Sequence, residues 1–258
     1  MIRTPGVVAA GHQITAQAAA EILAAGGNAF DAAMAALFAS CVAEPVLASL
    51  GGGGFLLART GSGAPLLYDF FSQTPRRKSP VGTTDFYPIV ADFGTAQQEF
   101  HIGMGSIATP GVVKGVFEIH RDLCRLPMSE IVAPACDAAR AGVAVNNLQH
   151  YISEIVSPII LSSPGALSLH ASRRAPERIA QPGERVHQTE QADSFELLAR
   201  EGEDLFYQGE MGGPLIRACS EQGGHLQQQD LNGYRVIRRQ PLHLNYHGAY
   251  LSTNPAPS

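Results

Sequence analysis

Apolar residues recur at helical spacing along most of the chain. Ile14, Ala18 and Ile22 lie four residues apart, which places them on one face of a helix. The following segment, residues 29–42, is apolar almost all round and predicts a central, buried helix. The same pattern analysis predicts helices over residues 13–25, 29–42, 109–123, 129–141, 146–161, 194–202 and 213–224.

Capping residues mark where two of these helices begin. A pair of glycines ends the first helix, and Asn28 then starts the next one. Asp31 stands at the third helical position after Asn28, which is the spacing of a capping box. Thr109 is predicted to cap the helix over residues 109–123, because a side-chain oxygen at that position can accept from free backbone amides.

Strand patterns lie near both ends of the chain. They predict a buried strand at residues 6–10, a hairpin at 55–74, and a strand pair at 234–253 that turns at His247-Gly248. Residues 76–100 and 163–188 show no clear period and are predicted to be surface loops. Strands near both ends with helices between them predict a layered α+β fold, with residues 1–258 as a single domain.

Composition and charge limit the classes of partner. The 258 residues carry a net charge of −5 and no basic tract, which argues against a nucleic-acid partner. The short basic run "PRRKSP" is interpreted as a solvated loop. The most apolar stretch, "AAMAALFASCVA", is too short to span a bilayer, so no membrane contact is expected. The first ten residues do not resemble a signal peptide, and a cytoplasmic location is expected.

Motifs that would complete an active site are missing from the sequence. Four widely spaced cysteines predict reduced thiols, three of them buried, and neither zinc nor another metal or cofactor is expected. Gly51–Gly54 precede a strand rather than a helix, so close backbone packing explains them better than phosphate binding. His243 and His247 lie in a strand–turn pattern that does not suit one metal. Asp69 is interpreted as a hydrogen-bonding carboxylate rather than a general base.

Three long stretches resemble the γ-glutamyltranspeptidase family. "GHQITAQAAAEILAAGGNAFDAAMAALFASCVAEPVLASLGGGGFLL" resembles the opening of the family, with its Gly-Gly-Asn-Ala-x-Asp-Ala-Ala box. "ATPGVVKGVFEIHRDLCRLPMSEIVAPACDAARAGVAV" and "GEDLFYQGEMGGPLIRACSEQGGHLQQQDLNGYRV" resemble two later segments in the same order. The resemblance implies an N-terminal-nucleophile hydrolase with an αββα sandwich, incomplete in this chain. It covers nearly the whole chain, and residues 76–100 and 163–188 match least.

The resemblance also implies that the catalytic residue lies elsewhere. Family members are precursors that cut themselves into a large and a small subunit, and the small subunit begins with a catalytic Thr. "NPAPS" is similar to the Pro-x-Pro-Ser found inside the family's large subunit. The chain therefore resembles the front part of a large subunit, and no catalytic residue is expected within it. Its expected partners are the remainder of that subunit, the small subunit and a small-molecule amide substrate.

One departure from the family concerns the substrate. Where the family has Asp-Phe-Arg-Glu, this chain has "DFFS", so Phe71 replaces the Arg that grips the α-carboxylate of a γ-glutamyl group, and Ser72 replaces the Glu. An aromatic ring cannot replace a bidentate guanidinium, which favours an amidase or acyltransferase with another acyl donor, unless Phe71 is simply a core residue. Alternatively, Arg76 or Arg77 holds the carboxylate and γ-glutamyl transfer is kept. A third interpretation is a non-catalytic homologue that serves as a scaffold.

Overall fold

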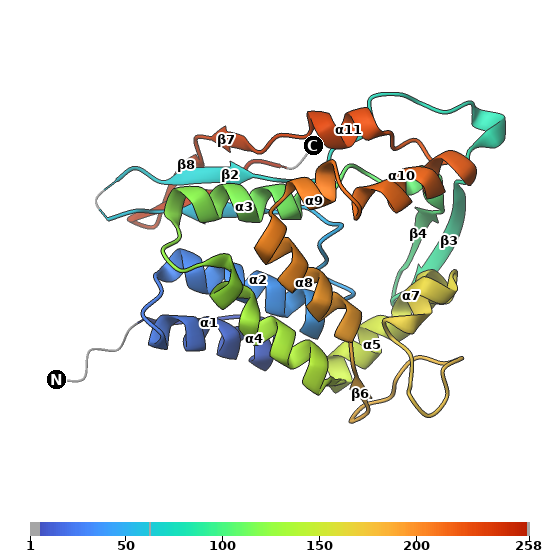
Figure 1. Cartoon of the computed structure of the whole chain (residues 1–258), viewed down its shortest axis with the longest axis horizontal. Helices are drawn as coiled ribbons and strands as arrows, with labels where there is room; N and C mark the ends of the chain where they lie inside the picture. The colour runs from blue at the N-terminus through green and yellow to red at the C-terminus, as the bar shows by residue number, and fades with distance from the viewer. Residues whose placement is uncertain (1–5, 62, 257–258) are drawn as a thin grey trace.

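Helix α2 (Ala29–Ala43) is the element around which the other helices pack. The computed structural model describes residues 6–61 and 63–256, and Figure 1 shows α2 enclosed by its neighbours. Its buried side chains point in all directions, and it packs against α1 (Gln13–Ala24), α3 (Val112–Leu123) and α4 (Met128–Ala141). A helix that is apolar on every side is stabilised most when other elements cover all of its faces, which explains its central place. The prediction of a buried central helix is confirmed.

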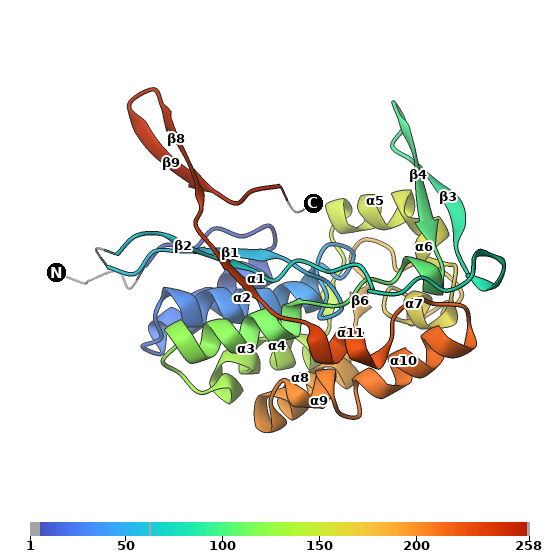
Figure 2. The same cartoon turned by 90° about the horizontal axis from the view of Figure 1, so that it is seen from above.

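The remaining helices form the other side of the molecule. Helix α8 packs against α4, and α9, α10 and α11 follow it in the chain. Helices α5, α6 and α7 gather at the opposite end from the N-terminus (Figures 1 and 2). Their bounds are α5 Asn147–Ile155, α6 Ser157–Ile160, α7 Pro164–Ser168, α8 Thr189–Glu201, α9 Asp204–Tyr207, α10 Gly212–Glu221 and α11 Gln228–Gly233. All seven predicted segments are helical, but α8 starts at Thr189 rather than Ser194, and the segment predicted at 146–161 divides into α5 and α6.

A three-stranded antiparallel sheet lies along one side of these helices. Its order is β1 (Phe55–Ala58), β2 (Leu66–Asp69), β7 (Ile237–Arg239). The face that carries Tyr68 and Phe70 joins the core with α3, whereas the opposite face leaves Leu57, Ile237 and Phe71 exposed. The hairpin predicted at 55–74 is confirmed, and β7 joins it from the other end of the chain.

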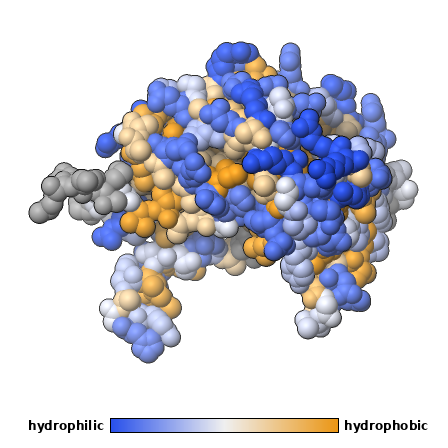
Figure 3. All heavy atoms as spheres, turned by 90° about the horizontal axis from the view of Figure 1, so that it is seen from below, coloured by the Kyte–Doolittle hydropathy of each residue, from blue (hydrophilic) through white to orange (hydrophobic). Residues whose placement is uncertain are grey.

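Two hairpins project from the body as arms (Figures 2 and 3). One is β3 (Tyr87–Asp92) with β4 (Gln97–Ile102), and the other is β8 (Leu242–Tyr246) with β9 (Ala249–Thr253). Both carry exposed large apolar side chains, among them Val90, Leu244 and Tyr250. A third two-stranded sheet, β5 (Val143–Ala144) with β6 (Arg185–Val186), has two residues in each strand. The strand pair predicted at 234–253 is confirmed for β8 and β9, whereas its first part forms β7 and pairs with β2. Pro257 and Ser258 lie outside the described residues.

The structure corrects four predictions from the sequence. Residues 6–10 form no strand, and Val7 is 95% exposed, because a short apolar run becomes a strand only beside a partner strand. Residues 163–188 are not all loop, because they contain α7 and β6. Residues 76–100 are not all loop either: they contain β3 and most of β4, whose side chains are mostly exposed and so show no period-two pattern. Thr109 does not cap α3, because its backbone pairs with Gln73 and the helix starts after Gly111. The helix amides of Gly111 and Val112 donate to the carbonyl of Gly52 instead.

The predicted capping box at α2 is confirmed and extends into a tertiary contact. The carboxylate of Asp31 is fully buried and accepts from the backbone N–H groups of Asn28 (2.7 Å), Arg125 (2.9 Å) and Leu126 (3.1 Å). Burial by itself would raise the pKa of Asp31, but these N–H donors outweigh it and the pKa lies below its ordinary value. The ionised carboxylate therefore joins the start of α2 to the loop that follows α3.

We expect Asp31→Asn to lower the free energy of unfolding at pH 7 by about 2 kcal/mol or more, because an amide cannot accept all three bonds and has no charge. Because the folded pKa is depressed, the stabilisation is present above the ordinary pKa of 3.8 and is lost as the pH falls through the folded value. Urea titrations at pH 7 and below pH 4 measure both effects. The exposed Asp137→Asn in α4 is the control and should change stability little; equal losses for the two variants would contradict the prediction.

Candidate functional site

Phe71 is the second residue after β2, and hydrogen bonds hold both its backbone N–H and its carbonyl. Its N–H donates to Asp69 Oδ1 (3.1 Å), and its carbonyl accepts from the hydroxyl of Tyr234 (2.9 Å). Burial, followed by the nearby carboxylates, raises the pKa of Tyr234, so the hydroxyl keeps its proton and remains a donor at neutral pH. The strand end therefore holds its position whatever side chain residue 71 carries.

The ring of Phe71 lies at the surface rather than in the core. It is 38% exposed and stacks on Phe55 of β1, with ring centroids 5.7 Å apart and an angle of 22° between the planes. Register pairs Phe55 with Asp69, which places the stacked rings on the face of the sheet that lies away from the helices. Phe71 is therefore outside the core that this chain forms by itself, and the two rings form an apolar wall at the end of the strand.

Asp69 also binds a cation that sequence analysis did not single out. Arg239 of β7 donates through Nε to Asp69 Oδ2 at 2.6 Å, so both oxygens of this buried carboxylate accept a hydrogen bond. The neighbouring Arg238 points to the other face of the sheet, where it pairs with Glu118 (3.1 Å) and Asp122 (2.7 Å). The interpretation of Asp69 as a hydrogen-bonding residue is confirmed. Arg239 was missed because its pairing with β2 spans 170 residues.

The glycine run allows its backbone to pass in direct contact with the end of the strand. A Cβ atom at Gly53 would lie 2.3 Å from the nitrogen of Ser72 and 2.8 Å from the Cα of Phe71, so only glycine fits there. Gly54 exchanges two backbone hydrogen bonds with Phe70. Gly51 by contrast has only Ser49 Oγ at 3.8 Å. The predicted close backbone packing is therefore confirmed at Gly53 and Gly54 but not at Gly51.

The other predicted site residues lie further along the chain. Ser72 is half-buried and follows Phe71 over Gly53. The backbone N–H of Arg76 donates to Asp230 (2.9 Å), and its guanidinium lies against Gly233 at the end of α11. Arg77 is exposed. The structure therefore brings Ser72 beside Phe71 and leads Arg76 toward α11, while Arg239 is the arginine tied to the Phe71 backbone through Asp69.

Within residues 6–61 and 63–256, no three His, Cys, Asp or Glu side chains are grouped so that they could hold a metal ion. All four cysteines are free, and burial raises the pKa of the Cys41 thiol to about 12. None of the helices in these ranges combines the length and apolar character that crossing a bilayer requires.

Comparison with known proteins decides the family. The family model described as gamma-glutamyltranspeptidase matches residues 15–258. The chain belongs to this family. It is 33% identical to the acylase ACY 1 proenzyme of Pseudomonas sp. (strain V22) and 31% identical to the glutathione hydrolase proenzyme of Pseudomonas aeruginosa, with 98% of the chain covered in each case. The family resemblance seen in the sequence is confirmed.

Solved structures of the family share the fold. The γ-glutamyltranspeptidase of Pseudomonas nitroreducens, complexed with L-DON, matches with a TM-score of 0.81 and 31% identity over 98% of this chain and 72% of that chain. The enzyme of Helicobacter pylori, at 23% identity, has a TM-score of 0.83 and supports the fold alone. The predicted α+β class, with the αββα sandwich of N-terminal-nucleophile hydrolases, is confirmed. The chain spans 45% and 43% of the two Pseudomonas proenzymes named above.

We expect Gly53→Ala to destabilise the protein by about 1–3 kcal/mol, because the new methyl group meets backbone atoms that cannot move alone. The same substitution at Gly51 is the matched control and should change stability by less than about 0.5 kcal/mol. Thermal unfolding of both variants measures the difference. Equal stability of the two variants would show that the strand end does not lie against Gly53.

Proposed function

We propose that this chain is part of an amidase or acyltransferase whose nucleophile is a Thr outside the chain, and whose acyl donor is not an ordinary γ-glutamyl group. The observation that carries the proposal is Phe71, an exposed, stacked ring at the position of the family's carboxylate-binding Arg. Membership of a family with acylase and glutathione hydrolase relatives supports the reaction class. The proposed partners are the rest of the large subunit and the small subunit produced by self-cleavage.

The proposed chemistry proceeds through an acyl-enzyme. The Thr hydroxyl attacks the carbonyl carbon of the amide, its proton passes to the free α-amine of the same residue, and the amide C–N bond breaks as the amine leaves with a proton. Water or a second amine then takes the acyl group and regenerates the Thr hydroxyl. In this scheme Phe71 and Ser72 bind and orient the acyl group, and no residue of this chain enters a bond-making step.

The side chain at position 71 supports the proposed choice of acyl group. A guanidinium holds a carboxylate by paired charge-assisted hydrogen bonds, each of about 1.5–3 kcal/mol. The rings of Phe71 and Phe55 make none of these bonds and favour an uncharged, apolar segment instead. The loss of two such bonds corresponds to about two orders of magnitude or more in preference.

Two alternatives make different demands on the structure. True γ-glutamyl transfer needs a relocated cation, for which Arg76 and Arg77 were predicted; the glutathione hydrolase relatives favour this alternative. A non-catalytic scaffold needs no nucleophile at all. The sequence of the rest of the protein separates these classes, because a Thr-Thr-His-type cleavage site indicates an enzyme and its absence indicates a scaffold.

In the complete protein we expect uncharged acyl anilides to react with a kcat/KM about 100-fold above that of a γ-glutamyl anilide. Phe71→Arg should reduce or reverse the preference for uncharged donors, because it restores a guanidinium that can bind a carboxylate through two hydrogen bonds. Phe93→Arg, an exposed aromatic on the β3–β4 arm, is the control and should leave the preference unchanged. A wild-type preference for the γ-glutamyl donor would refute the proposal and direct attention to Arg76, Arg77 and Arg239.

A second expectation concerns the 258-residue chain alone. We expect no amidase turnover from it, because the proposed Thr nucleophile and its α-amine are supplied by another chain. Release of a chromogenic aniline from both donor classes, measured with and without the remaining chain, tests this. Turnover at enzymatic rates by the purified 258-residue chain would show that a nucleophile lies within it.

A further inference from the structure

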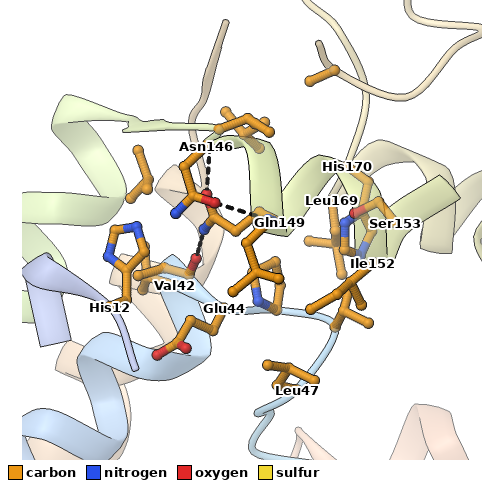
Figure 4. Close-up of a pocket in the computed structure, with 18 of the residues that line it drawn as sticks. His12, Val42, Glu44, Leu47, Asn146, Gln149, Ile152, Ser153, Leu169 and His170 are labelled. Atoms are coloured by element: carbon orange, nitrogen blue, oxygen red, sulfur yellow. Dashed lines mark hydrogen bonds between the residues drawn. The ribbon is translucent and has the colours of Figure 1, made fainter. Parts of the chain in front are cut away.

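A mostly apolar pocket opens between the end of α2, helix α5 and the segment 169–188 (Figure 4). Its cavity volume is about 60 Å³. The inner walls are buried aliphatic side chains, including Val42, Val143 and Val186, whereas Leu47 and Leu148 are exposed at the rim. Neither Phe71 nor any of the other predicted site residues lines it.

Polar groups with unused hydrogen-bonding capacity are built into these walls. The side chain of Gln188 is 5% exposed, and its Nε2 donates to the carbonyl of Val42 at 3.1 Å. This bond fixes the amide orientation, since a flipped amide would set two carbonyl oxygens against each other. Within the described ranges of the chain, Gln188 Oε1 is buried and accepts no hydrogen bond. A buried acceptor without a donor is costly, so the wall favours an occupant that supplies one.

Ser153 and His170 supply further hydrogen-bonding groups to the lining of the pocket. Ser153 is 6% exposed and lines the pocket from α5. Burial lowers the pKa of His170, so its imidazole is neutral at physiological pH and offers one N–H and one acceptor nitrogen. Figure 4 shows both side chains with Ile152 and Leu169 on one side of the pocket, and His12 and Glu44 on the other.

We propose that this pocket binds a small neutral molecule with an aliphatic body and one hydroxyl or primary-amide head group. Pockets with apolar walls and a few convergent polar groups are the usual form of small-molecule sites. A water molecule needs about 10–15 Å³ of such space, so the cavity holds roughly four to six non-hydrogen atoms. An anion is disfavoured because Glu44 is the charged group in the lining and no Lys or Arg lies there. In the proposed complex the aliphatic body covers the valines, and the head group donates to Gln188 Oε1 and accepts from the hydroxyl of Ser153.

The probe for this site is 2-methylpropan-1-ol, added to the complete protein and followed by saturation-transfer NMR. We expect saturable binding in the millimolar range. Ser153→Ala should weaken it about three- to tenfold, because one hydrogen bond to the head group is lost. Glu154→Ala, the exposed neighbour on the same helix, is the matched control and should leave the affinity unchanged.

A blocking variant tests occupancy of the cavity itself. Ala180 lines the pocket and is buried, so Ala180→Val places two extra carbons inside it and should abolish binding. If this variant fails to fold, the comparison of Ser153→Ala with Glu154→Ala still decides the question. Absence of saturable binding to the wild-type protein, as when another segment of the complete protein fills the pocket, would refute the proposal. Equal affinity of wild type and Ser153→Ala would refute it as well.

Discussion

The carboxylate of Asp31 joins the start of α2 to the loop after α3, and the packing of the helical layer depends on that set of bonds. Its oxygens accept from the start of α2 and from two backbone amides about 95 residues away in sequence. An ionised group in the core is tolerated only when donors surround it, and here three of the donors are backbone N–H groups whose positions the fold must hold. The central helix therefore has a fixed start as well as a fixed environment, and α1, α3 and α4 pack around it.

The close backbone contact at Gly53 connects the helical layer to the candidate site. Gly52 accepts from the first amides of α3, Gly53 lies against the backbone of Phe71 and Ser72, and Gly54 pairs with Phe70. Three consecutive residues thus join a helix start, a strand end and the glycine turn. A side chain larger than hydrogen at Gly53 would separate these parts, which explains the glycine at that position.

Because these hydrogen bonds involve the backbone of Phe71, the fold at this point and the substrate specificity depend on different groups. Asp69 and Tyr234 hold Phe71 through its main-chain N–H and carbonyl, so the strand end does not depend on the side chain at that position. With Phe71 at this strand end the chain keeps the family's architecture, with a TM-score of 0.81 to the Pseudomonas nitroreducens enzyme. Under the proposed function, the side chain at this position affects the choice of acyl group and leaves the fold unchanged.

Local rules in the sequence were sufficient for the long helices, the capping box of Asn28 and Asp31 and the hairpins β1–β2 and β8–β9, because each depends on neighbours within a few positions. They did not predict the short helices α7, α9 and α11. The family could also be recognised from the sequence, since its motifs occur in order along the chain. Tertiary structure alone decided that Thr109 pairs with Gln73 instead of capping α3, that residues 6–10 form no strand, and that β3 and β4 pair although their side chains face water. It also decided that Arg239 meets Asp69 and that Gln188 closes a pocket beside α2. These contacts join residues far apart in the chain, and no periodicity or spacing in one segment specifies which distant segment will supply the partner.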